Sequence, residues 1–180
     1  MAHIHTNPGE HDQTISAFII RDDLGEPKLM LHMHKKLHVL LQPGGHIELN
    51  ENPWQAISHE IAEETGYSMD QLQILQPKGS ISAITGATLH PQPVVYNTHN
   101  FDPEGNHRHT DISYAFVTSS DPTLELDEGE SADIRWVSRD ELVALDAAAI
   151  FQNVREVGLH VLENVYTTWD RVDTGTFNAA

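Results

Sequence analysis

Three glutamates, Glu60, Glu63 and Glu64, lie close together in the chain, and a fourth, Glu51, lies shortly before them. In a helix, positions i, i+3 and i+4 share one face, so these carboxylates would repel one another by a few tenths of a kcal/mol per pair. They would also lie near the C-terminal end of the helix, where its dipole disfavours negative charge. A bound divalent cation would remove this conflict, and carboxylate oxygens are the ligands that Mg²⁺ and Mn²⁺ prefer. The alternative is a solvated acidic face that binds no metal.

The segment that carries the glutamates has the signals of a helix with defined ends. Asn52 is a good N-cap, Pro53 suits the first helical position, and Gln55 stands where a capping box has Glu or Gln. Gly66 supplies the residue that commonly follows the last turn. The sequence therefore predicts a helix over residues 52–65.

A glycine pair, Gly44–Gly45, precedes the acidic segment and would let the backbone approach a metal or a phosphate closely. The stretch 45–67 resembles the Nudix box, in which a glycine, five residues, a glutamate and seven residues precede R-E-U-x-E-E-x-G-U, where U is bulky and apolar. With Tyr67 counted as apolar, every fixed position matches except His59, where the family has arginine. The resemblance extends more loosely over about residues 14–145.

Similarity to the Nudix hydrolases implies an α/β/α sandwich with a mixed β-sheet, a central helix and a long C-terminal helix. It also implies an enzyme that cleaves a diphosphate bond in a nucleotide-like substrate by attack of water on phosphorus. In such an enzyme Mg²⁺ or Mn²⁺ neutralises the phosphate charge and activates the water.

The resemblance also assigns roles to individual residues. The metal ligands would be Glu60, Glu63, Glu64 and the carbonyl of Gly45. The base that takes the proton of the water would be Glu60 or Glu64, or a glutamate of a later loop. Glu128 and Glu130 are the candidates in that loop, and Glu130 is preferred because it shortly precedes a predicted strand.

The departure from the pattern at His59 affects a contact that we call the brace, between the predicted helix and the loop that precedes it. In the family the arginine at this position is thought to pair with the glutamate that follows the five-residue spacer, here Glu51. Arginine offers a permanent charge and two parallel donors, whereas a histidine offers one proton near neutral pH. We therefore expect a Glu51–His59 brace that weakens as pH rises, with no metal ligand lost.

Basic side chains that could contact substrate phosphates are few, because the chain has only ten Lys and Arg. The candidates for substrate binding are Arg21, Lys35, Lys36 and His109. Alternation along a strand would place His107, His109 and Asp111 on one face, where they could line the pocket or form a minor metal site. For each of these residues the alternative is an ordinary surface position.

The rest of the pattern predicts the elements that would position these residues. Alternating and β-branched segments predict strands at 14–21, 28–33, 38–41, 72–75, 94–97, 112–118 and 134–137. Residues 101–109 and 123–131 read as loops, and a capping box at Ser138 opens a short helix. Apolar residues at three- and four-residue spacing predict a long helix over 148–169, which packs on the core or forms a dimer interface.

Composition limits the class of protein. A chain of 180 residues suits one domain, expected over 14–172, after a polar segment 1–13 and before a frayed tail 173–180. The formal net charge of −17 argues against general nucleic-acid binding, and the absence of cysteine excludes disulfides and thiolate sites. Without a signal peptide or an apolar stretch of bilayer length, we expect a cytoplasmic protein that does not enter membranes.

Two other classes of function were weighed against hydrolysis. A Nudix-fold module that senses a nucleotide without cleaving it remains the main alternative, although such modules often lack the glutamates that this chain keeps. An isopentenyl-diphosphate isomerase shares the fold but needs a cysteine, and this chain has none. The expected partner is a small nucleotide-like molecule, with a homodimer possible through the C-terminal helix.

Overall fold

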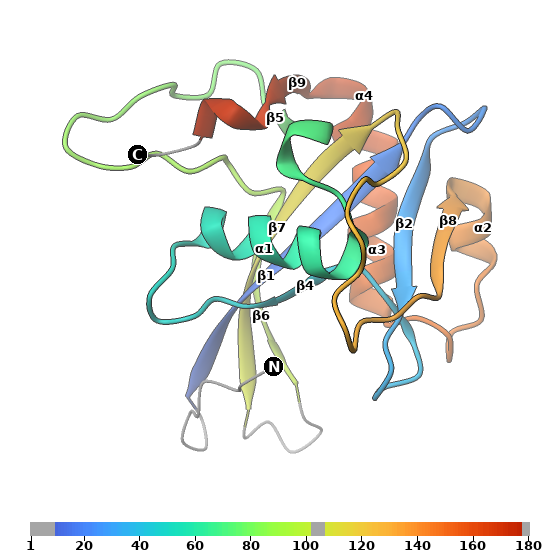
Figure 1. Cartoon of the computed structure of the whole chain (residues 1–180). Coiled ribbons are helices and arrows are strands. Elements are labelled where there is room, and N and C mark those ends of the chain that lie inside the picture. The colour runs from blue at the N-terminus through green and yellow to red at the C-terminus, as the bar shows by residue number, and fades with distance from the viewer. Residues whose placement is uncertain (1–9, 102–106, 178–180) are drawn as a thin grey trace.

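The structure, a computed structural model, describes residues 10–101 and 107–177, and it is built around one mixed β-sheet (Figure 1). Within these residues the sheet has nine strands in the order β3-β2-β1-β7-β5-β9, with β4 on β1, β6 on β7 and β8 on β2. The strands are β1 (His11–Arg21), β2 (Lys28–Met33), β3 (Leu40–Leu41), β4 (Gly44–His46), β5 (Gln73–Gln76), β6 (Val95–Asn100), β7 (Arg108–Thr118), β8 (Ile134–Ser138) and β9 (Asp170–Asp173). Among the paired strands of the described residues, only the central pair, β1 and β7, runs parallel.

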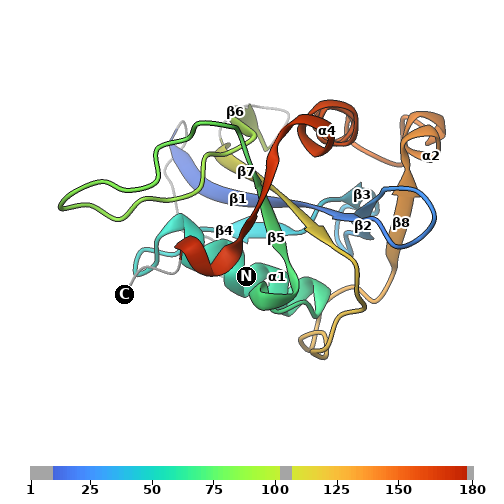
Figure 2. The same ribbon diagram turned by 90° about the horizontal axis from the view of Figure 1, so that it is seen from above.

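Helices cover both faces of the sheet. Helix α1 (Pro53–Thr65) lies on one face, and Figure 2 shows it on the opposite side of the strands from α2 (Arg139–Ala144) and α4 (Tyr166–Thr168). In the chain, α2 is followed by α3 (Gln152–His160) and the π-helical turn η2 (Val161–Val165), which lead into α4. The structure also has two short 3₁₀ turns, η1 (Met69–Gln71) and η3 (Thr174–Phe177). This arrangement confirms the expected α/β/α sandwich with a mixed sheet. In the part of the chain described, no helix has the length and apolar character that crossing a bilayer requires.

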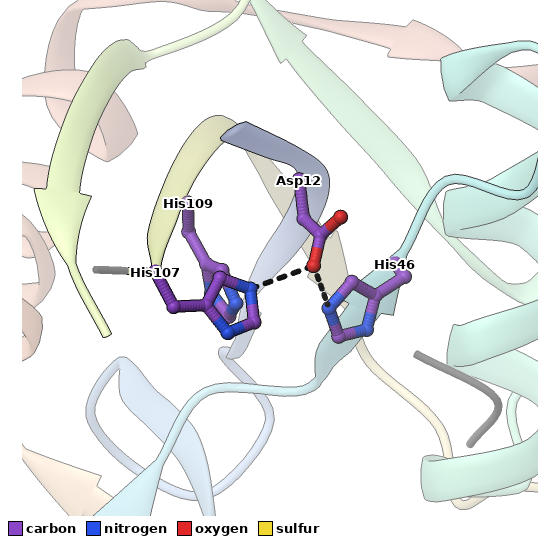
Figure 3. Close-up of side chains that lie close together, drawn as sticks. All are labelled: Asp12, His46, His107 and His109. Carbon is purple, nitrogen blue, oxygen red and sulfur yellow. Dashed lines mark hydrogen bonds and ion pairs between the residues drawn. The ribbon is translucent and has the colours of Figure 1, made fainter. Parts of the chain in front are cut away.

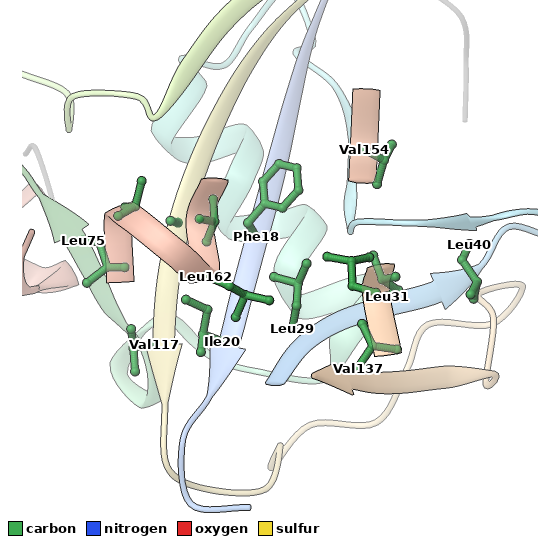
Figure 4. Packing of buried hydrophobic residues seen from close by; sticks show 14 of the residues in the cluster. Phe18, Ile20, Leu29, Leu31, Leu40, Leu75, Val117, Val137, Val154 and Leu162 are labelled. Atoms are coloured by element: carbon green, nitrogen blue, oxygen red, sulfur yellow. The ribbon is translucent and has the colours of Figure 1, made fainter. Parts of the chain in front are cut away.

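Strand β1 separates two hydrophobic cores. Its residues Ile15, Ala17 and Ile19 pack with the buried side chains of α1, such as Ile57 and Ile61. The residues between them face the other way, so that Phe18 and Ile20 pack with α3 and η2 (Figure 4). Because successive side chains of a strand point to opposite faces, a central strand covered on both sides is apolar at nearly every position.

The central strands extend further than the hydrophobic pattern indicates. Residues 101–109 were expected as a loop and strands were expected to begin at 14 and 112, but β1 begins at His11 and β7 at Arg108. The added residues are polar, and their backbones pair across the sheet, with His11 opposite Arg108 and Asp12 opposite His109. On its other side, the extended part of β7 pairs with β6, and Asn100 lies opposite Arg108.

Other element boundaries also shift. The expected strand 38–41 is reduced to β3 because His38 adopts a positive φ of 55° in a turn. Gly44–His46, for which no strand was predicted, forms β4. The strands expected at 72–75 and 94–97 are observed as β5 and β6. The long C-terminal helix begins at Gln152 rather than Ala148, since residues 146–149 form a turn in which the Asp146 side chain accepts from Ala148 N.

The expectation of a frayed tail from Asp173 is wrong for residues 173–177. Strand β9 pairs with β5, and Thr174 is 2% exposed, with its hydroxyl donating to the carbonyl of Met69 at 2.6 Å. The edge of β5 offers backbone groups that a following segment can pair with, whatever its side chains. Residues 178–180 lie outside the described part of the chain.

Candidate active site

Helix α1 is held at both ends by the residues that the sequence marks. The Asn52 side chain accepts from Trp54 N at 2.9 Å and Gln55 N at 3.0 Å, and Gln55 Oε1 accepts from Asn52 N at 2.9 Å. At the other end Gly66 has a φ of 71°, and its N–H donates to Ala62 O at 3.1 Å. These caps fix where the helix begins and ends, while the packing of Ile57 and Ile61 on the sheet holds it in place.

Two of the three helical glutamates are buried against the glycine pair. Glu60 is 6% exposed and Glu64 is 3% exposed, whereas Glu63 is exposed to solvent. Glu64 Oε2 accepts from the N–H of Gly44 at 2.8 Å. A side chain at Gly45 would overlap the Glu60 carboxylate, which would have to leave its present position.

Burial perturbs both carboxyl groups strongly. Burial raises the pKa of Glu60 to about 7, opposed by His59 and reinforced by Glu63 and Glu130. Burial also raises the pKa of Glu64 to about 8, although the hydrogen bond from Gly44 acts in the opposite direction. Carboxylates that must ionise in such a place need a compensating positive charge.

The groups at this site fit a divalent cation. Ligand atoms of His59, Glu60 and Glu63 all lie within 4.8 Å of one another. Glu64 lies outside that group of three, but it is one helical turn from Glu60 and shares its buried face. Carboxylate oxygens beside a closely approaching glycine backbone are hard donors, suited to Mg²⁺ or Mn²⁺.

Glu51 and His59 lie in contact, as the sequence led us to expect of a brace. His59 Nδ1 is 2.9 Å from Glu51 Oε2, and the other carboxylate oxygen of Glu51 accepts from Glu48 N at 2.8 Å. His59 Nε2 also lies 3.5 Å from Glu60 Oε1. A single histidine thus bridges the loop that precedes α1 and a carboxylate of the acidic cluster.

The later acidic loop folds back over α1. Asp127 N donates to Glu63 O at 3.1 Å, and Glu130 N donates to Asp127 O at 3.0 Å. Glu130 is half-buried and close enough to raise the pKa of both Glu60 and Glu64. Glu128, by contrast, is exposed to solvent.

The basic residues expected to contact the substrate phosphates differ in whether their side chains are accessible. Arg21 is buried and its guanidinium pairs with Asp23 at 2.7 Å and with Asp121, so its donors are already used within the protein. Lys35 donates to the carbonyl of Gly129, next to Glu130 in the acidic loop. Lys36 is exposed. We therefore remove Arg21 from the substrate-binding candidates and keep the two lysines.

The histidines of β7 gather with residues that the sequence analysis did not single out. His109 lies near His107, Asp12 and His46, and burial together with the neighbouring histidines lowers the pKa of His109 to about 4. Asp111, expected beside them, instead accepts from Thr14, Ser16 and Ser113. Only the pairing of β1, β4 and β7 could have identified Asp12 and His46.

A hollow of about 450 Å³ lies along α1 beside this site. It is lined by Trp54, His59, Ala62, His90 and Phe177, among others. Trp54 is 5% exposed and its ring stacks on Phe116, so the half-buried Phe177 supplies most of the aromatic surface of this hollow.

Comparisons with known proteins agree with this geometry. Residues 10–157 match the model of the NUDIX domain family. A hydrolase of the NUDIX family from Clostridium perfringens has a similar structure, with 29% identity and a TM-score of 0.67, over 86% of this chain and 97% of that chain. No curated protein sequence matches the chain.

Two more distant structures share the fold. The C. elegans Ap4A hydrolase is 16% identical, with a TM-score of 0.58, over 82% of this chain and 93% of that one. The NUDIX domain of Shewanella oneidensis NrtR, determined with ADP ribose, is also 16% identical, with a TM-score of 0.57, over 82% and 86%.

Proposed function

Because the chain belongs to the Nudix family and is a Nudix pyrophosphohydrolase, we propose that it hydrolyses the diphosphate bond of a nucleotide derivative with the help of Mg²⁺ or Mn²⁺. The observation that carries this proposal is the burial of Glu60 and Glu64 against Gly44–Gly45, with both carboxyl pKa values raised to about 7 and 8. Two ionised carboxylates without a cation would be unfavourable in this buried place, so the site favours binding of a cation.

The proposed ligands are Glu60, Glu63, Glu64 and the carbonyl of Gly45. A divalent ion held there would neutralise phosphate charge and lower the pKa of a bound water. The Glu51–His59 contact positions Glu60, since His59 reaches both carboxylates. The N–H of Gly44 donates to one carboxylate oxygen of Glu64, which leaves the other oxygen available to bind the metal.

The base is proposed to be a glutamate of the same site. A water oxygen attacks one phosphorus, the bond from that phosphorus to the bridging oxygen breaks, and the proton of the water passes to a carboxylate. Glu130 suits this role because it is half-buried near the cluster without being one of the ligands proposed above. Glu60 and Glu64 remain candidates, since a base works best with a pKa near the working pH.

The substrate class is proposed from the aromatic hollow and the phosphate-facing groups. Phe177, which is half-buried and lines the hollow, offers a surface on which a base could stack. Lys35, Lys36 and His109 are the proposed contacts to phosphates. Ap4A and ADP ribose, named for two structures of the same fold, are nucleotide derivatives with internal diphosphate bonds and are the first compounds to try.

The test is a panel of nucleotides, sugar nucleotides and dinucleoside polyphosphates incubated with the purified protein and Mg²⁺ or Mn²⁺. Products are identified by mass, with Glu64→Gln as the inactivating variant and Glu26→Gln, in an exposed turn, as the matched control. We expect cleavage at a diphosphate bond that only Glu64→Gln abolishes. Tight binding of a nucleotide without turnover would instead indicate a sensing module.

A further inference from the structure

A second group of metal-ligating side chains lies at the end of the central strands. Asp12 of β1, His46 of β4, and His107 and His109 at the start of β7 each offer one ligand atom, and these atoms lie within 4.8 Å of one another. Figure 3 shows the rings of His107 and His46 directed at one oxygen of Asp12, and the ring centroid of His109 lies 5.0 Å from that of His107. Asp12 Oδ2 lies 2.6 Å from His107 Nε2 and 3.6 Å from His46 Nε2.

The strand register brings these four residues together. In the parallel pair β1–β7, Asp12 lies opposite His109, and in the antiparallel pair β1–β4, Thr14 lies opposite His46. Since alternate residues of a strand share a face, Asp12 and Thr14 point to the same side, and so do their partners. Backbone hydrogen bonds of three strands therefore hold the cluster in place.

The cluster is buried and its hydrogen bonding is incomplete. Asp12 is 1% exposed and His46 is 6% exposed. Asp12 Oδ1 and His109 Nε2 are buried and have no hydrogen-bond partner among the described residues. Buried polar atoms are nearly always paired in folded proteins, so the unpaired His109 Nε2 and Asp12 Oδ1, beside an Asp12 Oδ2 that lies close to two imidazoles, indicate a missing partner.

We propose that Asp12, His46, His107 and His109 form a second metal site, which binds a borderline transition-metal ion such as Zn²⁺. Three imidazole nitrogens and one carboxylate oxygen match the four-coordinate arrangement that Zn²⁺ adopts in structural sites. Imidazole suits Zn²⁺ and its neighbours in the transition series, whereas Mg²⁺ prefers oxygen donors. The two sites of this protein would therefore select different metals.

The position of the second site gives it a structural role. It would tie β1, β4 and β7 together at one end of the sheet. His46 directly follows Gly45, so an ion at His46 would also hold the backbone that lies against Glu60. A metal that binds only the folded state stabilises it by mass action.

The test uses Co²⁺ as a spectroscopic substitute for Zn²⁺. Tag-free protein is stripped with a chelator and titrated with Co²⁺, whose visible absorption is strong in four-coordinate sites and weak in octahedral oxygen sites. We expect strong bands at one equivalent, which Zn²⁺ removes by displacement. The bands should persist in Glu64→Gln, so that this outcome is independent of the proposed hydrolysis.

The decisive variant is His107→Gln, because its side chain is 25% exposed and the fold should tolerate the change. Loss of a supporting hydrogen bond alone lowers metal affinity about 10- to 100-fold, so loss of a ligand should lower Zn²⁺ affinity at least as much. The matched control is His160→Gln, which changes an exposed histidine of α3. His3→Gln/His5→Gln should also leave the bands unchanged.

The proposal is overturned by either of two results. One is a Co²⁺ spectrum of octahedral type in the wild type, and the other is an identical Zn²⁺ affinity in wild type and His107→Gln. If His107→Gln unfolds, His109→Gln replaces it, and the thermal shift on adding Zn²⁺ provides a second readout. That shift should be present in the wild type and in His160→Gln, and a shift retained in His109→Gln would also contradict the site.

Discussion

At the scale of single residues, the buried carboxyl groups of α1 control how the metal-free protein responds to pH. The pKa of Glu64 is raised from its ordinary 4.5 to about 8, so between these values the folded state holds a proton that the unfolded state releases. The stabilising effect is full below pH about 4.5 and is lost as pH rises to about 8. Stability should therefore fall over this range.

The variant Glu64→Gln should weaken this pH dependence. Glutamine keeps an acceptor for Gly44 N–H but cannot ionise, so between pH 5 and 8.5 the chelated variant should lose less free energy of unfolding than the wild type, by on the order of 3 kcal/mol. Denaturant unfolding at a series of pH values measures the difference. Parallel curves for the two proteins would show that Glu64 is not protonated in the folded state.

The contact between His59 and Glu51 leads to a second residue-scale prediction. Arginine stays charged at every pH that proteins tolerate, whereas histidine does not. His59→Arg should therefore gain activity relative to the wild type as pH rises from 7 to 9, by about two- to fivefold, because a partly exposed ion pair contributes up to about 1 kcal/mol. Superimposable pH profiles of kcat/KM would contradict the brace.

At the scale of elements, α1 could be predicted from local residues, whereas the edge strand β9 could not. Asn52, Gln55 and Gly66 define the helix by their own hydrogen bonds and backbone conformations, which need no distant partner. Strand β9 has no strand-like pattern in its sequence and forms because the edge of β5 is available. The meeting of Asp12 with His109 depends on pairing between segments far apart in the chain, which hydrophobic periodicity does not encode.

The cap of α1 provides the prediction at this scale. Asn52→Ala removes the acceptor for Trp54 N and Gln55 N and should lower the free energy of unfolding by about 1 kcal/mol. Turnover per folded molecule should change little, since tertiary packing still holds the helix. The control is Asn164→Ala, an exposed position in η2, and an equal loss of stability in both variants would remove the cap as the cause.

At the scale of the whole molecule, the excess of acidic residues affects how substrate arrives. The formal net charge is −17, and a nucleotide derivative with phosphates is itself an anion. Salt screens this repulsion, so with free metal held constant kcat/KM should rise roughly twofold or more between low and physiological ionic strength. A fall with salt would mean that a local positive field around Lys35 and Lys36 dominates the approach.

The carboxylates of α1 are proposed to hold the metal that is required for turnover. The most direct measurement is the rate of diphosphate cleavage as a function of free Mn²⁺, for chelated wild type and Glu64→Gln in parallel. We predict no turnover without metal, a rate in the wild type that follows Mn²⁺ binding to saturation, and almost no rate in the variant at any concentration. Turnover that persists in excess chelator, or equal rates in the two proteins, would contradict the account.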